Sequence, residues 1–388
     1  HFTLSFDKKR GRITEYLFDG QPRLVAGPRF QFWRAPTDND DNTWGDQKMA
    51  IRWREVGLDA LQESVRAVIN QASGGKVEIT VQSDFAGQVD LAQVAEQSWQ
   101  GQLAQLRQML THLMTAEQVG QVAQHFGLDY ATLPGASHAD RVHRFVAEID
   151  RRNAVGQLLQ QLDFLAQGPF AQFIPAEVKT LLAQSAAIPP DQLKLAFAPK
   201  DVARFACVLT YVIDGSGAMD LHAQVTPGGA QPLALPRIGL TMTLPAGLET
   251  FTWFGRGPHE SYVDRNLGAK IGRYQGTVDE QYVVYQMPQE NGNKTEVRWA
   301  TLADEAGGGW RITSPSSPLE MSVHHFTAED LTKAMHTYEL QRRDEITLNV
   351  DYAQGGLGNA SCGPGVLPQY LLAPVPVSFG VRLEPLPG

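Results

Sequence analysis

The chain has 388 residues, of which 43% are hydrophobic and 19% are charged, and its net charge is −9 at pH 7. This length exceeds one ordinary domain of about 100 to 200 residues, so two or more units are expected. The negative charge and the lack of any Lys/Arg run argue against nucleic acid or an anionic membrane as a partner.

Cysteine content and hydropathy limit the compartment. The two cysteines, Cys207 and Cys362, cannot build a disulfide framework or a structural zinc site, which favours a reducing, cytoplasmic location. No apolar stretch approaches the roughly 18 residues of a membrane span. The sequence starts at His1 rather than at Met, so we expect a piece cut from, or processed out of, a longer protein.

Both ends of the chain show the two-residue period of half-buried strands. Phe2, Leu4 and Phe6 alternate with polar residues near the start. Residues 205–213 alternate again and lead into Asp214-Gly215, a dipeptide typical of hairpin turns. We therefore predict a mainly β unit formed by residues 1–90 and 195–388.

The middle of the chain has helical spacing instead. Its apolar residues recur every three or four positions over residues 103–113, 119–126, 142–149, 155–165 and 175–186. Thr115 followed by Gln118 resembles a capping box at the start of one of these helices. Residues 94–193 are therefore predicted to form an all-α helical bundle inserted into the β unit.

The most informative motif is Trp33-Arg34-Ala35-Pro36-Thr37-Asp38-Asn39-Asp40. Two acids, an amide and a guanidinium group around a proline predict a rigid polar loop, and loops of this kind commonly carry function. The alternative is an ordinary turn in which the Asp and Asn side chains bond to their own backbone.

Two further polar segments carry candidate acids. Residues 255–265 contain Arg256, Glu260, Asp264 and Arg265, whose charges are predicted to pair with each other in a tight loop, with ligand binding as the alternative. The glycines of this segment lack the spacing of a phosphate-binding loop. Residues 288–294 form a second polar turn, and no sequence rule pairs its acid with a second carboxylate, as sugar hydrolysis would require.

The histidines and the second cysteine are predicted to be structural. His324 and His325 are adjacent and would point to opposite faces of a strand, while His336 is predicted on a short helix over residues 328–334. A shared metal ion is therefore not expected. Cys362 lies in a glycine-rich loop without an identifiable base that could activate its thiol.

Together these motifs resemble the C-terminal domain of β-galactosidases of glycoside hydrolase family 2, which also occurs as a separate small chain. The matching segments, in order, are residues 32–40, 211–215, 255–265, 288–292 with Arg298-Trp299, His336, and 351–364. The resemblance implies a large antiparallel β-sandwich, a supersandwich of the galactose-mutarotase-like kind, docked beside a catalytic (β/α)₈ barrel. It also implies that no catalytic residue lies in this chain, and that any Mg²⁺ or Na⁺ of the whole enzyme is bound outside it.

The resemblance further implies which residues border the sugar. These are Asp38, Asn39, Asp40, Asn42, Trp44 and Cys362. A surrounding structural network of loops would be held by Arg34, Glu260, Asp264, Arg265, Glu290 and Arg298. Asn42 stands where a relative has a glycine hinge, and Cys362 where it has a tryptophan that stacks on the sugar, so loop freedom and leaving-group selectivity are expected to differ.

The helical insert resembles a bacterial effector-associated, death-like adaptor domain through residues 126–130, 133–135 and 151–153. Such domains pair with a like domain on another protein, so the resemblance implies a protein partner for the insert. The alternative is a bundle that only extends the surface of the sandwich.

For the whole chain, the leading hypothesis is a non-catalytic C-terminal portion of a β-galactosidase. It would complete the substrate site of a barrel that hydrolyses terminal β-D-galactosides with retention. One alternative is a stand-alone carbohydrate-binding sandwich with a helical recruitment module. Another is mutarotase-like activity on free galactose, which requires a histidine and a carboxylate at the sugar ring.

Overall fold

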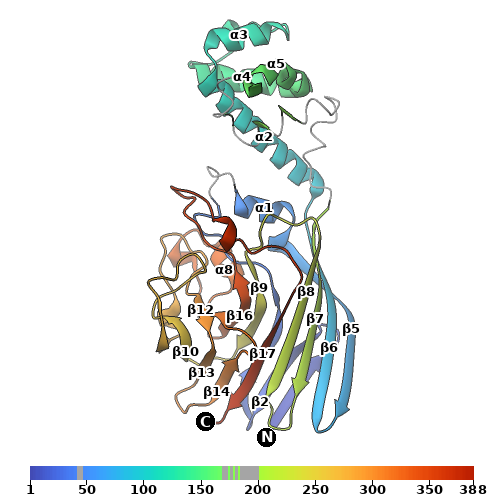
Figure 1. Ribbon diagram of the computed structural model, residues 1–388, viewed down its shortest axis with the longest axis vertical. Coiled ribbons are helices and arrows are strands. Elements are labelled where there is room, and N and C mark those ends of the chain that lie inside the picture. Colours follow the sequence, from blue (N-terminus) through green and yellow to red (C-terminus); the bar gives the residue numbers. More distant parts are fainter. Residues whose placement is uncertain (42–46, 168–173, 175–177, 180–181, 184–200) are drawn as a thin grey trace. The chain divides into compact units, whose positions relative to one another are not determined.

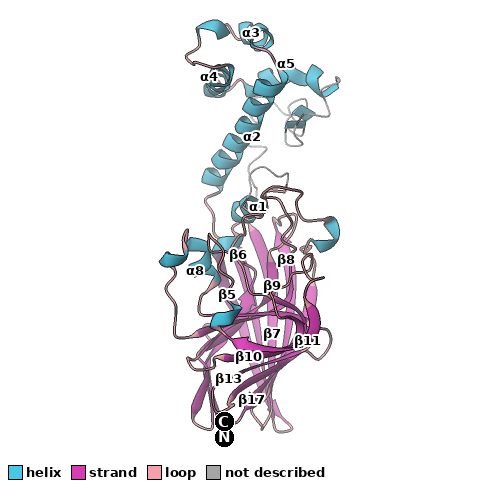
Figure 2. Ribbon diagram, turned by 90° about the vertical axis from the view of Figure 1, so that its left-hand side faces the viewer, coloured by secondary structure: helices cyan, strands magenta, loops and turns pink. Residues whose placement is uncertain are grey.

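The computed structural model describes residues 1–41, 47–167, 174, 178–179, 182–183 and 201–388. The chain divides into two compact units, residues 1–88 with 201–388 and residues 89–200. The first, called here the β unit, consists mainly of strands, and the second, the helical unit, consists of helices (Figure 2). The boundaries expected from the change of period, near residues 94 and 193, lie inside the second unit.

One sheet of the β unit has eight strands, whose neighbours run antiparallel. In spatial order these are β1 (Phe2–Asp7), β2 (Arg12–Phe18), β4 (Ala26–Gln31), β9 (Arg237–Leu244), β16 (Ile346–Gln354), β15 (Leu319–His324) and β12 (Lys294–Val297), with β3 (Gln21–Leu24) paired to β2.

The other sheet has nine strands and is also antiparallel. In spatial order these are β11 (Lys270–Thr277), β10 (Thr250–Gly257), β13 (Trp299–Ala303), β14 (Gly309–Thr313), β17 (Val377–Leu386), β8 (Met219–Gly229), β7 (Ala203–Ile213), β6 (Lys76–Gly87) and β5 (Leu61–Ser73). The hairpin predicted at Asp214-Gly215 is confirmed, because β7 and β8 pair from Ile213 opposite Met219.

The two sheets enclose a single hydrophobic core. The ring of Tyr16 in β2 lies 4.9 Å from that of Trp310 in β14, measured between centroids, and the rings of Phe32 and Phe205 stack at 4.0 Å. Each of these pairs brings the two sheets together, so the sheets are the layers of one sandwich. The predicted fold class, a mainly β antiparallel sandwich interrupted by helices, is confirmed.

Short helices connect strands of the β unit. The β unit contains the helices α1 (Met49–Glu55) and α8 (Ala328–Lys333). It also contains the 3₁₀ turns η1 (Leu58–Ala60), η5 (Asp279–Gln281), η6 (Thr337–Glu339) and η7 (Pro368–Tyr370). In α1 the indole of Trp53 is buried and donates a hydrogen bond to the Ala234 carbonyl at 2.8 Å. Figure 1 shows the N- and C-termini at the same end of the sandwich.

The helical unit contains α2 (Leu91–Leu113), α3 (Ala116–Gln124), η2 (Tyr130–Thr132), α4 (His138–Arg151) and α5 (Val155–Gln167), which pack around their own hydrophobic core. The capping box of Thr115 and Gln118 is confirmed at the start of α3. Most of the helix predicted over residues 175–186 lies outside the described residues. A search of the described residues finds no helix long and apolar enough to cross a membrane.

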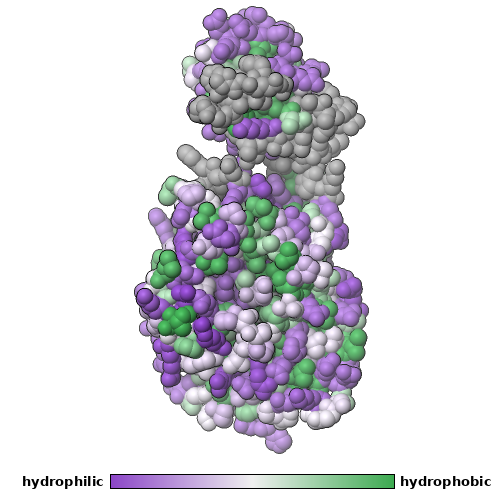
Figure 3. Space-filling view, viewed as in Figure 1, coloured by the Kyte–Doolittle hydropathy of each residue, from purple (hydrophilic) through white to green (hydrophobic). Residues whose placement is uncertain are grey.

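Hydrophobic and hydrophilic side chains are mixed on the face of the β unit that Figure 3 presents. The most exposed large apolar residues are Leu267 and Val284, in separate loops, and Tyr338, in η6. Singly exposed apolar side chains are ordinary on folded proteins, so these residues carry no functional argument.

Candidate functional site

A polar loop over residues 33–41 connects β4 to the segment that leads into α1. Its backbone is tied to two other segments. The Ala50 N–H donates to the Asp40 carbonyl at 3.0 Å, and the Glu290 N–H donates to the Ala35 carbonyl at 3.1 Å. The loop is therefore held between α1 and the turn at residues 288–294.

Arg34 lies at the centre of this loop. Its guanidinium group donates to both Asp40 carboxylate oxygens, at 2.8 and 3.1 Å, and to the carbonyls of Gly355 and Gly356, at 2.6 and 3.3 Å. The same group lies 5.4 Å from the centroid of the Trp53 ring. Arg34 and Asp40 are each only 1% exposed. A buried ion pair in which one guanidinium nitrogen binds both carboxylate oxygens, together with these additional partners, fixes three segments relative to one another.

Asp40 and Asn39 are engaged within the chain. One carboxylate oxygen of Asp40 accepts hydrogen bonds from the backbone N–H and the hydroxyl of Thr37, at 2.9 and 3.0 Å. The Asn39 amide donates to the Gly358 carbonyl and accepts from the Ser361 N–H, both at 2.9 Å. These two residues anchor the loop to itself and to residues 358–361.

Asp38 and Cys362 lie at the surface. The Asp38 N–H donates to Gln289 Oε1 at 3.2 Å, and no cationic side chain of the described residues pairs with its exposed carboxylate. Cys362 is a free, exposed thiol. Because Asn39 bonds to Ser361, the segments that carry Asp38 and Cys362 are neighbours. Asn42 and Trp44, the other expected sugar contacts, lie outside the described residues.

The charges of residues 255–265 do not pair with each other, which corrects the prediction. Asp264 accepts the N–H groups of Leu357 and Gly358, at 3.1 and 2.7 Å, and Arg265 donates to the Gly358 carbonyl at 2.5 Å. Backbone hydrogen bonds in both directions between residues 262 and 265 close a tight turn. The turn presents both side chains to the 355–361 segment.

Arg256 differs from the prediction for a related reason. Residues 255–257 are the end of strand β10 rather than part of a loop. The guanidinium group of Arg256 therefore projects from a strand and pairs with Glu296 at 2.5 Å. Arg298 donates to the Glu296 carbonyl at 2.8 Å and lies 5.5 Å from the centroid of the Phe254 ring.

Glu260 holds the next segment in place. Its carboxylate accepts the N–H of Gly292 at 2.8 Å and the hydroxyl of Tyr285. The ammonium group of Lys294 donates to the Gly292 carbonyl at 2.9 Å and lies over the Trp253 ring. Burial lowers the pKa of Lys294 to about 8. Glu260 therefore organises the backbone at residues 285–292.

Glu290 belongs to a buried charge network rather than to an open cleft. Arg237 lies 3.2 Å from Glu290 Oε1 and 3.0 Å from Asp351 Oδ2, and the Gln354 amide donates to Glu290 Oε1 at 3.2 Å. All four side chains are buried. A Cβ atom on Gly239, which faces Asp351 in the sheet, would lie 1.9 Å from Asp351 Oδ1. Glycine at this position therefore makes room for the Asp351 carboxylate.

The histidines are dispersed. His324 ends β15, and its Nε2–H donates a hydrogen bond to the Asn291 carbonyl at 2.9 Å, while His325 lies 3.0 Å from Glu249. His336 is exposed and follows α8, which ends at Lys333, so its predicted place on that helix is wrong. Within the described ranges, no group of three or more His, Cys, Asp or Glu side chains could hold a metal ion.

Burial strongly shifts the pKa values of Asp351 in the charge network and of Glu320, which lies opposite Asp351 in the sheet. It raises the pKa of Asp351 to about 8, against the opposing effect of Arg237, and that of Glu320 to about 7, against its hydrogen bond from Asn293. Burial also lowers the pKa of His324 to about 4. Each shift disfavours the charged form of a group held away from water.

The Glu320 shift predicts a pH-dependent stability. A folded-state pKa near 7, against an ordinary value of 4.5, means that the folded state binds the proton more tightly, so the free energy of unfolding falls as pH rises. Between pH 5 and 8 this fall is expected to be about 2–3 kcal/mol. Glu320→Gln, which keeps a neutral side chain at every pH, should remove it. Urea unfolding at several pH values measures the difference between the two proteins.

Asp351 and His324 also contribute to the pH dependence of the free energy of unfolding. Asp351 acts in the same direction as Glu320, whereas His324 removes stability as pH falls from 6.5 towards 4. Both remain in Glu320→Gln, and because the Glu320 charge also raises the pKa of Asp351, the difference between the two proteins reports Glu320 together with its effect on Asp351. Glu305→Gln, at an exposed carboxylate, should keep the wild-type slope. Equal slopes for Glu320→Gln and wild type would contradict the assignment.

Several residues of this region were not predicted from the sequence. Arg237 and Glu320 each stand beside apolar strand residues, so a charge within an apolar run was the available signal. The Gly355 and Gly356 carbonyls that bind Arg34 left no signal, because backbone oxygens are present at every position.

Three β-galactosidases show how much of a longer protein this chain resembles. The protein of Priestia megaterium is 38% identical over 153 residues, which is 39% of this chain and 15% of that protein. Those of Arthrobacter sp. (strain B7) and Halalkalibacterium halodurans are 35% and 34% identical over 42% and 45% of this chain, and 17% and 18% of their own lengths. The matched part is therefore less than a fifth of each relative.

A solved GalM/aldose epimerase homologue from C. elegans aligns with 48% of this chain and 61% of its own, with 12% identity and a TM-score of 0.28. The fold is therefore assigned from the two sheets of this chain, and not from its likeness to that structure. None of the relatives named here is described as an adaptor protein, and the death-like resemblance of the helical unit stays a prediction.

A family model described as "Beta galactosidase small chain" matches residues 1–170 and 175–383. This match covers nearly the whole chain and includes the motifs that build the Arg34 loop and its supporting segments. The chain therefore belongs to the β-galactosidase small-chain family.

Proposed function

We propose that this chain is the non-catalytic C-terminal portion of a β-galactosidase. It would complete the sugar site of a (β/α)₈ barrel that lies outside the chain and carries both catalytic glutamates. Family membership and the relatives named above support this proposal. The observation that carries it is the loop at residues 33–41, which a buried ion pair holds rigid while the Asp38 carboxylate stays exposed.

The network suggests a division of labour within the site. Asp38 is proposed to face the sugar, because its carboxylate is exposed and has no cationic partner among the described residues. Arg34, Asn39 and Asp40 are proposed to be positioning residues, because their polar groups are engaged inside the chain. Cys362 would border the same site, with Asn42 and Trp44 as further contacts. A rigid support of this kind lowers the cost of ordering the site around a ligand.

The proposal also covers cation binding, cellular location and the role of the helical unit. Any Mg²⁺ or Na⁺ of the whole enzyme would be bound outside the chain. A cytoplasmic location is supported by two free cysteines, one buried and one exposed. The helical unit would recruit a protein partner, which is supported by its separate hydrophobic core.

The test is hydrolysis of nitrophenyl β-galactoside by the isolated chain and by the native protein or assembly that contains it. The native sample is expected to be active and the isolated chain inactive. In the active sample, Asp38→Asn should lower kcat/KM by at least about tenfold, since a charge-assisted hydrogen bond is worth about 1.5–3 kcal/mol. Glu305→Gln, the same chemical change at an exposed acid, should leave kcat/KM unchanged.

Two outcomes would refute the proposal. An inactive native sample would remove the β-galactosidase assignment, and an active isolated chain would show that it carries its own catalytic groups. The alternative of a stand-alone sugar-binding protein predicts a native mass equal to that of this chain and no co-purifying catalytic partner.

A further inference from the structure

The outer face of the eight-stranded sheet is polar across several strands. In β9, Ile238, Leu240 and Met242 lie in the sandwich core, so Thr241 and Thr243 point to the opposite face. Outer faces of sandwich sheets usually meet water. Here, however, the loops and α8 cover much of this face, and many of its polar side chains are buried.

Strand register places these polar residues in rows. Arg29 of β4 lies opposite Thr241 of β9, which lies opposite Asn349 of β16. In a second row Thr243 lies opposite Thr347. Residues paired across antiparallel strands on one face have Cβ atoms about 5 Å apart, so these rows form a continuous polar floor.

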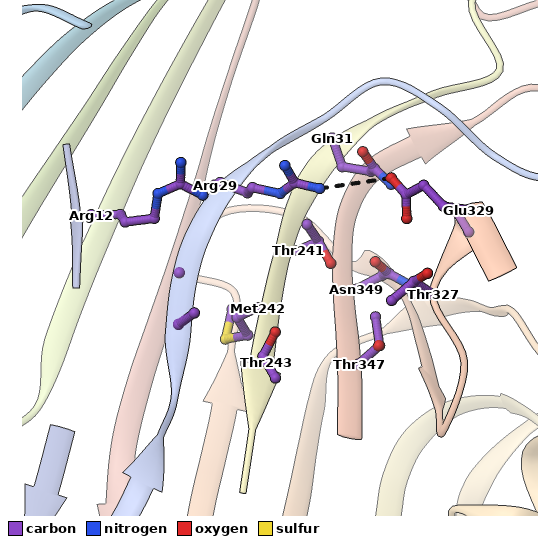
Figure 4. A pocket seen from close by; sticks show the side chains of 13 residues that line it. Arg12, Arg29, Gln31, Thr241, Met242, Thr243, Thr327, Glu329, Thr347 and Asn349 are labelled. Carbon is purple, nitrogen blue, oxygen red and sulfur yellow. Dashed lines mark ion pairs between the residues drawn. The ribbon is translucent and has the colours of Figure 1, made fainter. Parts of the chain in front are cut away.

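A cavity of about 230 Å³ opens over this floor. Figure 4 shows side chains from β4, β9 and β16 around it, with Thr327 and Glu329 of the α8 region on one side. Its polar floor is formed by Gln31, Thr241, Thr243, Thr347 and Asn349. At the rim, Arg29 and Glu329 pair at 3.8 Å.

The floor carries buried hydrogen-bonding groups without protein partners. Gln31, Thr241 and Asn349 are 8%, 9% and 7% exposed. Among the described residues, neither the Gln31 amide nor the Thr241 hydroxyl has a hydrogen-bond partner, and Asn349 uses only its NH₂ group, to Ser322 at 3.1 Å. The free polar atoms of these three residues are open to the cavity, so a polar molecule from outside the chain can form these bonds in place of water.

The chemistry of the lining identifies the class of that molecule. Amide and hydroxyl groups offer both donors and acceptors, which match hydroxyl groups that also donate and accept. Two arginines also line the cavity, and each has a carboxylate counter-charge: Arg29 pairs with Glu329 at 3.8 Å and Arg12 with Glu63 at 3.6 Å, so the lining does not select for an ion. We propose that this cavity binds a neutral, polyhydroxylated molecule of monosaccharide size, at a site separate from the Asp38 loop.

The arrangement is suited to binding rather than to chemical conversion. The only carboxylate that lines the described cavity, that of Glu329, is paired with Arg29, and no histidine is part of the lining. A mutarotase-like proton transfer at the sugar ring would need both groups free to act. The cavity therefore does not support the mutarotase alternative.

Calorimetric titration of the full chain with galactose, glucose and glycerol tests the proposal. Saturable binding of a hexose is expected, and Thr241→Val should weaken it at least about fivefold, because valine keeps the shape of threonine but cannot form the hydrogen bond. The Thr241 hydroxyl has no protein partner, so this variant should unfold at the wild-type urea concentration. Thr226→Val, at an exposed threonine of β8, is the matched control and should bind like wild type.

The other outcomes overturn the proposal. Absence of saturable binding would mean that the cavity holds only water. Hexose binding that Asp38→Asn abolishes and Thr241→Val does not would place the sugar at the Asp38 loop. Because the Asp38 assignment is tested by hydrolysis and this site by binding to the isolated chain, either can fail without the other.

Discussion

Replacement of Arg34 by alanine is expected to lower the free energy of unfolding of the β unit by about 3–5 kcal/mol. The change removes a guanidinium group that is 1% exposed. It leaves the Asp40 carboxylate buried beside Thr37 without a counter-charge. It also leaves the Gly355 and Gly356 carbonyls without their donor. Urea unfolding of the chain, followed by tryptophan fluorescence, measures the loss.

Two variants make this result specific. Arg54 pairs with Asp41 at 2.8 Å, but both side chains are about 40% exposed, so Arg54→Ala should cost less than about 1 kcal/mol. Arg34→Lys keeps the charge but loses the planar fork that reaches Asp40 and the two carbonyls, so it should recover only part of the loss. Equal costs for Arg34→Ala and Arg54→Ala would show that the buried clamp does not hold the loop.

The Arg34 clamp shows why the site could be predicted only in part. The mixture of charges around Pro36 indicated a rigid loop, because the proline and the polar side chains that make the loop rigid are close together in the sequence. The roles of the two acids could not be separated, since Asp38 and Asp40 are two positions apart and chemically alike. Their difference arises from Arg34, whose carbonyl partner Gly355 lies 321 positions away in the chain.

The difference between local and long-range interactions also explains which other features could be predicted from the sequence. The hairpin at Asp214-Gly215 and the capping box at Thr115 were predictable, because each depends on neighbouring residues. The partners of Asp264 and Arg265 were not, because residues 357 and 358 approach them only in the folded sandwich. A charge-rich segment indicates that pairing will occur, but tertiary structure selects the partner.

The buried charge network connects the sheet to the loop. Glu290 joins Arg237 through its side chain and Ala35 through its backbone N–H. Arg237 in turn contacts Asp351 on the next strand. A substitution within the sheet can therefore shift the loop at residues 33–41 although it touches no residue at the surface. This link is the physical reason to expect that the stability of the charge network and the position of the loop at residues 33–41 change together.

Phe145→Ala is expected to destabilise the helical unit by about 3–5 kcal/mol and to leave unfolding of the β unit unchanged. Phe145 is fully buried in α4, where its ring packs against those of Phe126 and Tyr130, at 6.3 and 6.4 Å between centroids. Its removal leaves a large cavity in a core that contains no residue of the β unit. Circular dichroism at 222 nm should report earlier loss of helix, while hydrogen exchange of β-strand amides should stay at the wild-type rate.

A matching substitution in the core of the β unit tests the same independence from the other side. Phe251 is fully buried in β10 and belongs to the sandwich core, so Phe251→Ala should accelerate exchange in the strands and leave the helices at their wild-type stability. Two separate cores require two separate responses, because a cavity acts on the residues that surround it. If Phe145→Ala also destabilised the strands, the two units would unfold cooperatively, and the helical unit could not be a module that is gained or removed independently of the sandwich.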